Sequence, residues 1–201
     1  VSAPRVSRGQ EKLAQLRSQI DPIAKQYGVP AEVLVAIWGM ESSYGQQLGN
    51  YSAIRSLATL AYQGREDRRG FWTKQLLAAL NIIKTGDMPL NSLRGSWAGA
   101  IGHTQFIPTT FEEFAVDFDG DGKRDLRKSI PDALASTANY LAQSGWQQGQ
   151  AWGTEVVLPV TFDWTETEPA NWQALSYWMA QGVYRVDGEP LNLSHTTRSA
   201  V

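Results

Sequence analysis

The amino-acid sequence predicts a mainly helical protein with a small mixed α/β appendage at its C-terminal end. Up to about residue 146, apolar residues recur at spacings of three and four, which is the pattern of amphipathic helices. Glycine and proline stand between these segments, where helices end or begin. Beyond that point, short β-rich stretches replace the helical pattern. We therefore divide the chain into a helical core at residues 1–153 and an appendage at residues 154–201.

The first two helices are predicted before residue 42. In the first, over about residues 10–27, the apolar stripe consists of Leu13, Leu16, Ile20, Ile23 and Tyr27. Pro22 is expected to break or restart this helix, and Gly28 to cap its end. Pro30 then opens a second helix, whose residues 33–40 are apolar on every side. Such a helix belongs in the middle of a domain.

Further helices are expected at about residues 52–62 and 70–85, the latter closed by Gly86. Residues 95–102 are mostly small, so that backbone can approach another surface closely, and they are interpreted as a loop that lines a groove. A short helix ending near Val116 follows from a capping box, formed either by Thr109 and Glu112 or by Thr110 and Glu113.

The last helix of the core is predicted to start at Ser129, Pro131 and Asp132 and to stop at Gly145. In the appendage, residues 155–162 are expected to form an edge strand that contains Pro159. A short helix at about residues 169–181 and a second strand at residues 183–186 complete the prediction.

Composition excludes several classes of function. The chain of 201 residues is 42% hydrophobic and 19% charged, which is typical of globular proteins, and its net charge of −2 argues against binding to nucleic-acid phosphates. The absence of cysteine leaves chemistry to carboxylates, hydroxyls, amides and two histidines. No apolar stretch is long enough to span a bilayer. The first eight residues do not resemble a secretory signal, so in an exported protein the signal has been removed.

Glu41 is the first candidate for chemistry, because it follows eight uncharged residues on the second predicted helix. Its helical neighbours at spacings of three and four are Ile37, Trp38 and Tyr44, and bulky apolar groups disfavour a charged carboxyl. A raised pKa would make Glu41 a general acid near neutral pH. The alternative is a buried glutamate paired with an arginine such as Arg65, Arg68 or Arg69.

Residues 117–122, DFDGDG, match the first half of an EF-hand calcium loop. Lys128 stands where an EF-hand places its bidentate glutamate, so the closing ligand is either Asp132 or missing, and Asp125 could add a further contact. We favour a structural cation that clamps two helices. A solvated acidic loop balanced by nearby basic residues is the alternative.

Three blocks in order carry a resemblance to a known family: IWGMESSYG at residues 37–45, GSWAGAIGHTQFIP at residues 95–108 and AVDFDGDG at residues 115–122. Together they resemble the lytic murein transglycosylases of the membrane-bound B type. The likeness covers nearly the whole chain and is weakest after about residue 163. In that family, N-terminal and C-terminal helices extend the core further, and we expect the core's C-terminal helices to be absent from this chain.

The resemblance implies a goose-type lysozyme-like helical core and an enzyme that cleaves the β-1,4 bond between N-acetylmuramic acid and N-acetylglucosamine in peptidoglycan. Glu41 takes the place of the family's single catalytic acid and base. The sugar's own C6 hydroxyl replaces water, so the product is a 1,6-anhydromuramoyl sugar and one carboxyl suffices.

The same resemblance implies a substrate site beside Glu41. Ser96, Gln105 and Tyr140 match groove residues of the family, and hydroxyl, amide and aromatic groups suit sugars. The remaining candidates are neighbours of these residues or of Glu41, namely Tyr44, Trp97, His103, Phe106 and Asn139.

The cation loop also matches the family, in which the closing acid comes from the following helix. The implied ligand set consists of Asp117, Asp119, Asp121, Lys123 and Asp132. Calcium is the expected ion and sodium the alternative, and catalysis requires no cofactor.

The expected partners are peptidoglycan strands, with no nucleic acid, and the expected protein is a monomer of the bacterial cell envelope. It is periplasmic, either free or held at the outer membrane by a lipid anchor upstream of the chain. Two other functions stay open. A lysozyme-type muramidase would let water attack, and a calcium-stabilised module would bind glycan without cutting it.

Overall fold

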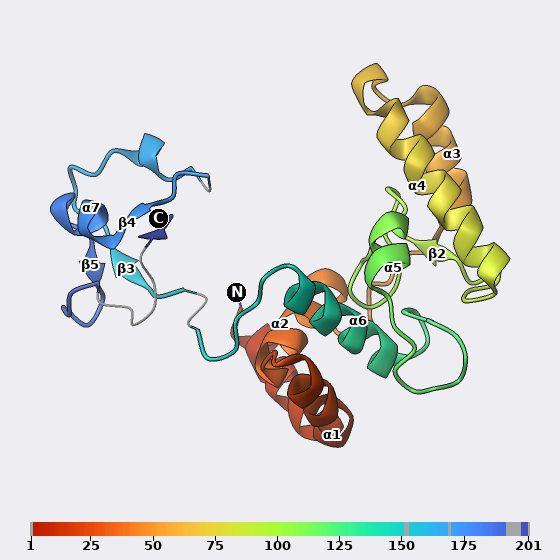
Figure 1. Ribbon diagram of the computed structural model, residues 1–201, viewed down its shortest axis with the longest axis horizontal. Helices are drawn as coiled ribbons and strands as arrows, with labels where there is room; N and C mark the ends of the chain where they lie inside the picture. The colour runs from red at the N-terminus through yellow and green to blue at the C-terminus, as the bar shows by residue number, and fades with distance from the viewer. Residues whose placement is uncertain (1, 151–152, 169, 192–197, 201) are drawn as a thin grey trace. The chain divides into compact units, whose positions relative to one another are not determined.

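The computed structural model describes residues 2–150, 153–168, 170–191 and 198–200, and it is mainly helical, as predicted (Figure 1). Contacts divide the chain into two compact units, Val1–Gln148 and Gly149–Val201. The boundary expected after residue 153 falls inside the second unit. Over the described ranges, no helix has the length and apolar character needed to cross a membrane.

The first unit begins with α1 (Ala3–Tyr27) and α2 (Ala31–Ser42), which pack against each other. The predicted break at Pro22 is wrong, because α1 continues through this residue. Proline inside a helix removes one backbone hydrogen bond at a cost of about 3 kcal/mol. Here Ile20 and Ile23 on either side of it are completely buried, and their burial offsets that cost. Gly28 ends α1 with a left-handed backbone, as predicted.

The next two helices, α3 (Ala53–Gln63) and α4 (Glu66–Thr85), form a hairpin (Figure 1). The backbone N–H of Arg55 donates to the side chain of Ser52, which caps α3. The start of α4 lies before the predicted residue 70, because Glu66 and Asp67 suit the positive end of a helix.

The predicted capping boxes do not form. Helix α5 (Pro108–Phe114) begins at Pro108, with Ile107 at the N-cap, because proline is well suited to the first turn. Thr109 instead contacts α4, since its backbone N–H donates to Gln75 Oε1 at 3.0 Å. Glu112 also contacts α4, since it accepts a hydrogen bond from Asn81 at 2.6 Å.

Helix α6 (Ile130–Gln143) starts as predicted, because Ser129 caps it by accepting from the backbone N–H of Asp132. Before it, β1 (Tyr51–Ser52) pairs with β2 (Arg94–Gly95) in antiparallel register. Single bridges from Gly95 to Ile101 and from Ile101 to Phe106 extend this pairing.

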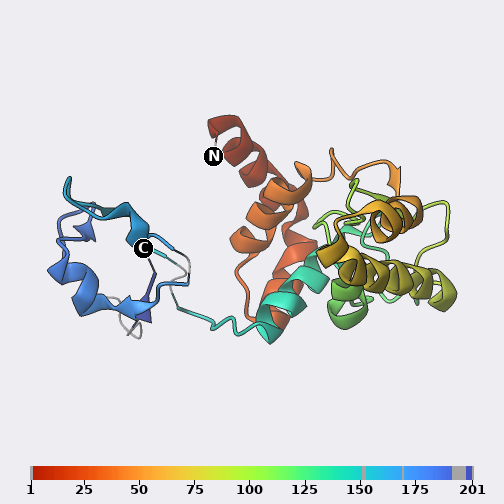
Figure 2. The ribbon, with the colours of Figure 1, turned by 90° about the horizontal axis from the view of Figure 1, so that it is seen from above.

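Two hydrophobic clusters hold the first unit together. One joins α3, α4 and α5 around residues such as Leu57, Ile82 and Phe111. The other joins α1, α2 and α6 around residues such as Leu34 and Leu134. Figure 2 shows the same helices from above.

The second unit has its own small core, formed by Phe162, Trp178, Val183 and Leu191. Strand β3 (Val156–Val157) pairs with β5 (Tyr184–Arg185), and β4 (Gln173–Ala174) pairs with β6 (Arg198–Ser199). The predicted strand at residues 155–162 and helix at residues 169–181 are both too long. The structure instead has β3, followed by the 3₁₀ turn η1 (Trp164–Glu166), β4 and the short α7 (Leu175–Ala180).

Candidate functional site

Glu41 lies in the last turn of α2 and is exposed to solvent. The expectation of a helix buried on all sides is wrong. One stripe, which includes Leu34, Trp38 and Ser42, packs into the core, while Met40 is 59% exposed. Glu41 lies off that stripe, and its carboxyl therefore faces an open cleft and not the interior.

This cleft has a volume of about 250 Å³ and is bounded by α2, α6 and the segment that leads into α5. Its lining residues are Ile37, Glu41, Thr104, Gln105, Phe106, Ile107, Thr110, Thr137, Tyr140 and Leu141. Among the described residues, Glu41 is the only carboxyl group that lines it. The sequence-predicted residues Glu41, Gln105, Phe106 and Tyr140 are thus brought together, although they come from three separate segments.

Directly after α2, the chain turns through two residues with left-handed backbones, Ser43 (φ 50°) and Tyr44 (φ 58°). Tyr44 is buried, and its hydroxyl donates to the carbonyl of Arg5 in α1 at 2.8 Å. It does not line the cleft, although it stands three residues after Glu41. Its contacts instead fix the exit of α2 against α1.

Gln105 lies in the tight turn between Ile101 and Phe106 and also has a left-handed backbone, with φ 52°. Its side-chain Nε2 donates to the carbonyl of Gly102 at 2.9 Å. A residue other than glycine in this conformation is strained by roughly 1–2 kcal/mol. The turn thereby holds the amide of Gln105 at the cleft.

His103 is 8% exposed and does not line the cleft. Its Nδ1 accepts a hydrogen bond from Trp38 Nε1 at 2.9 Å, and its carbonyl accepts one from Ser42 Oγ at 2.6 Å. Burial lowers the pKa of this imidazole, and the charge of Arg127 lowers it further. His103 thus connects the residues on both sides of Glu41 to the turn that carries Gln105.

Thr104 was not singled out from the sequence. It is 5% exposed, it lines the cleft, and its hydroxyl is the one buried side-chain polar atom without a hydrogen-bond partner in the described part of the chain. Buried hydroxyls almost always have a partner. No sequence signal marked it, because threonine is common in loops and the lack of a partner follows from the tertiary structure.

Tyr140 extends from α6 into the cleft and is 40% exposed. Its ring packs edge-on against those of Phe106 and Phe114, at centroid distances of 6.0 and 5.0 Å. Asn139 precedes it but does not line the cleft, because its Nδ2 donates to the carbonyl of Phe114 at 2.9 Å. Asn139 therefore fixes α6 against the end of α5.

Ser96 and Trp97 belong to the small-residue loop and are not among the residues that line this cleft. Ser96 Oγ accepts from the backbone N–H of Ala100 at 3.1 Å, while Trp97 is 65% exposed. The loop packs closely, as its composition predicts. A Cβ atom at Gly99 would lie 2.6 Å from Leu57, and one at Gly95 only 1.8 Å from the carbonyl oxygen of Ala100.

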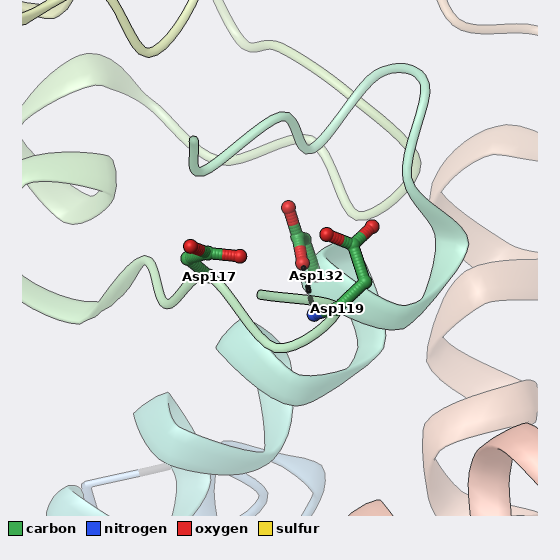
Figure 3. A group of neighbouring side chains, drawn as sticks. All are labelled: Asp117, Asp119 and Asp132. Atoms are coloured by element: carbon green, nitrogen blue, oxygen red, sulfur yellow. Dashed lines mark hydrogen bonds between the residues drawn. The ribbon is translucent and has the colours of Figure 1, made fainter. Parts of the chain in front are cut away.

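The acidic loop brings Asp117, Asp119 and Asp132 together, with one carboxylate oxygen of each within 4.8 Å of the others (Figure 3). Asp132 is fully buried and accepts from the backbone N–H groups of Phe118, Asp119 and Asp125. Burial raises the pKa of its carboxyl, while these hydrogen bonds oppose the rise.

Asp121 and Lys123 are not part of this group of three. Asp121 Oδ1 accepts from the backbone N–H of Lys123 at 2.9 Å. Asp125 is also engaged, because its Oδ1 accepts from the backbone N–H groups of Arg127 and Lys128. The structure thus brings together three of the four carboxylates that were predicted as ligands.

Arg124 joins the acidic loop to the end of the α3–α4 hairpin. It is one of the nearby basic residues that were expected only to balance the charge of the loop. Its guanidinium pairs with the buried Asp87 at 2.6 Å and lies 5.0 Å from the ring centroid of Phe111. Burial acts to raise the pKa of Asp87, but hydrogen bonds from Arg124 and Thr85 outweigh it and lower the pKa.

Comparison with known proteins adds independent evidence. The family model described as transglycosylase SLT domain matches residues 1–201. Membrane-bound lytic murein transglycosylase B of Escherichia coli K12 is 40% identical over 124 residues, which are 61% of this chain and 34% of the relative. The chain therefore spans about a third of that curated relative.

Solved structures also match. SltB3 from Pseudomonas aeruginosa, in complex with NAG-anhNAM-pentapeptide, is 54% identical with a TM-score of 0.86, over 95% of this chain and 50% of that one. Escherichia coli lytic transglycosylase Slt35 in complex with calcium is 28% identical with a TM-score of 0.86, over 100% of this chain and 62% of that one. The predicted lysozyme-like fold agrees with these matches.

Proposed function

The chain belongs to the transglycosylase SLT domain family, and on this premise we propose that it cleaves the glycan of peptidoglycan as a lytic transglycosylase. The bond cut is the β-1,4 linkage between N-acetylmuramic acid and N-acetylglucosamine. The product carries a 1,6-anhydromuramoyl end. The names of its relatives support this activity, since they are lytic transglycosylases and one was solved with a NAG-anhNAM-pentapeptide.

One observation carries the proposal: Glu41 is the single carboxyl among the described residues that line the cleft. A glycosidase whose own side chains activate water or form a covalent intermediate usually pairs two carboxyl groups across the bond, although substrate-assisted hydrolases do not, so the count favours the anhydro reaction only weakly. An anhydro-forming enzyme needs only one, because the substrate provides the nucleophile.

Glu41 first acts as an acid and donates its proton to the glycosidic oxygen, which leaves as the 4-hydroxyl of N-acetylglucosamine. The N-acetyl group of the muramoyl sugar stabilises the positive charge that develops at C1. The Glu41 carboxylate then takes the proton of the C6 hydroxyl, and O6 bonds to C1. The proton lost in the first half returns in the second, so no water is consumed.

We assign substrate contacts to the polar and aromatic residues that share the cleft with Glu41. The amide of Gln105 and the hydroxyl of Thr104 suit the hydroxyl and N-acetyl groups of a sugar, and the ring of Tyr140 suits an apolar sugar face. Ser96 and Trp97 stand on the neighbouring loop, where a longer glycan would extend. His103, Asn139 and Tyr44 act as positioning residues through the contacts described above.

We further propose that Asp117, Asp119 and Asp132 hold a structural cation, with calcium as the preferred ion. Three carboxylate oxygens that lie within 4.8 Å of one another suit a hard cation. One of the three residues, Asp132, is fully buried. A relative solved in complex with calcium supports this choice. The cation would join the loop to the start of α6, and it takes no part in the reaction.

The substrate places the protein in the bacterial cell envelope, where peptidoglycan lies, and its macromolecular partner is the glycan strand. A membrane-bound relative supports this location.

The proposal is tested by digesting purified peptidoglycan with the chain and with its Glu41→Gln variant, followed by mass spectrometry of the released fragments. We expect anhydro products, lighter by one water than hydrolysis products, and a loss of about 10²–10⁴-fold in the variant. Glu32→Gln is the matched control, since Glu32 is an exposed glutamate on the same helix outside the cleft.

Fragments with ordinary reducing ends would identify a muramidase instead. Binding of glycan without products, unchanged by Glu41→Gln, would identify a glycan-binding module. Either result would overturn the proposed reaction.

A further inference from the structure

A second hollow lies where the start of α3 meets β2. Figure 1 labels these two elements. Two adjoining cavities share Ser52, Arg55 and Arg94, and the larger of them, about 650 Å³, also includes Leu90 and Asn91. Among the residues that the structure describes, no acidic one lines either cavity. The hollow is therefore cationic, in a chain whose net charge is −2.

The charges of these arginines are not neutralised by the protein. Both Arg55 and Arg94 are exposed, and neither forms an ion pair with any described acidic residue. Arg94 is nevertheless held in place, because its Nη1 donates to the carbonyl of Asn50 at 2.9 Å and its Nε to that of Asn91 at 3.3 Å. Backbone carbonyls fix its position and leave its charge available for an anion.

A third arginine, Arg127, contacts the backbone around the hollow. Arg127 Nη1 donates to the carbonyls of Gly49 and Arg94, each at 3.0 Å, and its Nη2 donates to Asn50 Oδ1 at 3.3 Å. The backbone around the hollow is thereby held by a further positive charge. Burial and then the charge of Arg94 lower the pKa of Arg127, which Asp125 opposes, so the guanidinium groups of Arg94 and Arg127 lie close enough to repel each other.

The hollow also lies at the N-terminal end of α3, where the helix dipole adds a partial positive charge. Arg55 belongs to the first turn of that helix, and the capping Ser52 lines both cavities. A planar guanidinium with a hydroxyl beside it matches the geometry of a carboxylate.

The sheet connects this hollow to the cleft. The pairing runs from Tyr51 to Gly95, from Gly95 to Ile101 and from Ile101 to Phe106, which lines the cleft. At about 4.8 Å per strand, β2, which carries Arg94, lies roughly 10 Å from Phe106, and β1 lies roughly 15 Å from it. An extended peptide of five residues spans at most about 17 Å.

We propose that the hollow at Arg55 and Arg94 binds the terminal carboxylate of the peptide stem attached to the glycan in the cleft. This inference rests on the proposed function, which places a peptide-bearing muramoyl sugar beside Glu41. The hollow would then select strands with a full-length stem, independently of the groups that cut the glycan.

The test measures binding by calorimetry, with the Glu41→Gln chain so that the ligand is not consumed. The probes are NAG-NAM-pentapeptide, the same compound with its terminal carboxyl converted to an amide, and a peptide-free chitooligosaccharide. We expect the free acid to bind about fivefold more tightly than the amide, as for a solvent-accessible charge pair. Adding Arg55→Gln should reduce this preference, since Arg94 alone remains to pair with the carboxylate.

Arg55→Gln is preferred to a change at Arg94, because the side chain of Arg55 makes no hydrogen bond within the described structure that a substitution would break. Arg17→Gln is the matched control, since Arg17 is a half-exposed arginine on α1 outside the hollow and the cleft. That variant should keep the preference for the free acid.

Equal affinity for acid and amide, with the glycan still bound, would overturn the carboxylate site and leave the proposed function intact. A preference for the free acid that is undiminished in Arg55→Gln would overturn it as well. Absence of binding to all three probes, together with absence of peptidoglycan cleavage by the chain before substitution, would instead contradict the proposed function.

Discussion

The indole of Trp38 donates a hydrogen bond to Nδ1 of His103 at 2.9 Å, and the two rings meet edge-on with centroids 5.5 Å apart. Because Nδ1 accepts this bond, the neutral imidazole carries its proton on Nε2. Trp38 lies one turn before Glu41, and His103 lies two residues before Gln105. This single contact therefore sets the proposed acid relative to the amide across the cleft.

Acidic pH should weaken this contact. Since burial lowers the pKa of folded His103 below its usual 6.5, the folded state favours the neutral ring. The resulting stabilisation is complete above about pH 6.5 and is lost as the pH falls through the folded pKa. We expect the melting temperature to fall between pH 7 and pH 5.5, and the fall to be smaller in His103→Asn. An unchanged pH profile in that variant would contradict this role.

Replacing Gln105 by glycine should relieve backbone strain but reduce glycan cleavage. Gln105→Gly relieves a left-handed backbone worth roughly 1–2 kcal/mol but removes the hydrogen bond to Gly102 and adds chain entropy. We therefore expect the unfolding free energy to change by less than about 1 kcal/mol, while glycan cleavage falls at least about tenfold. Urea denaturation and a cleavage assay measure the two quantities. A stable variant with full activity would exclude Gln105 from the site.

The unpartnered hydroxyl of Thr104 should be dispensable for folding. Thr104→Val removes a buried polar atom that lacks a partner, so we expect a gain of about 1 kcal/mol in unfolding free energy and weaker glycan binding. Thr137→Val is the matched control, because the hydroxyl of Thr137 donates to the carbonyl of Ala133 at 2.9 Å. It should not gain stability. Unaltered glycan affinity in Thr104→Val would show that the hydroxyl does not contact the sugar.

Calcium should stabilise the chain through the group of three aspartates. Added at about 100 times its dissociation constant, a ligand that binds only the folded state contributes about 2.7 kcal/mol. We expect calcium to raise the melting temperature of the chain but not of Asp132→Asn. Asp21→Asn on α1 is the control and should respond like the unaltered chain.

Asp121→Ala, which removes the side-chain oxygens, separates the two versions of this site. The loop pattern includes Asp121 as a ligand, whereas the structure brings together only Asp117, Asp119 and Asp132. A calcium response that survives this change would favour the three-carboxylate site, and its loss would favour the full loop pattern.

Much of the fold could be predicted because local rules dominate it. The stripe in α1, the cap at Gly28 and the start of α6 at Ser129 all follow from spacing and capping within a few residues. The errors at Pro22 and at the start of α5 have the opposite cause. There, packing against neighbouring helices and contacts such as that between Thr109 and Gln75 outweigh local preference.

The residues of the candidate site also divide into those that the sequence could predict and those that it could not. Glu41 could be named from its helical neighbours, whereas Gln105 and Tyr140 could be named from the resemblance to a known family. Thr104 could not, since its lack of a partner is a property of the folded interior. Tyr44 lies only three residues after Glu41 in the sequence, yet its hydroxyl contacts α1 and it does not line the cleft.

The sequence by itself determined the helical character, the order of the core helices and the residue types available for chemistry, because these depend on periodicity and composition. Tertiary structure alone decided which groups converge. It made Glu41 the single carboxyl among the described residues that line its cleft, and it gathered Arg55, Arg94 and Arg127 around Asn50. The physical reason is that charge, burial and hydrogen-bond partners are set by neighbours in space, many of which are distant along the chain.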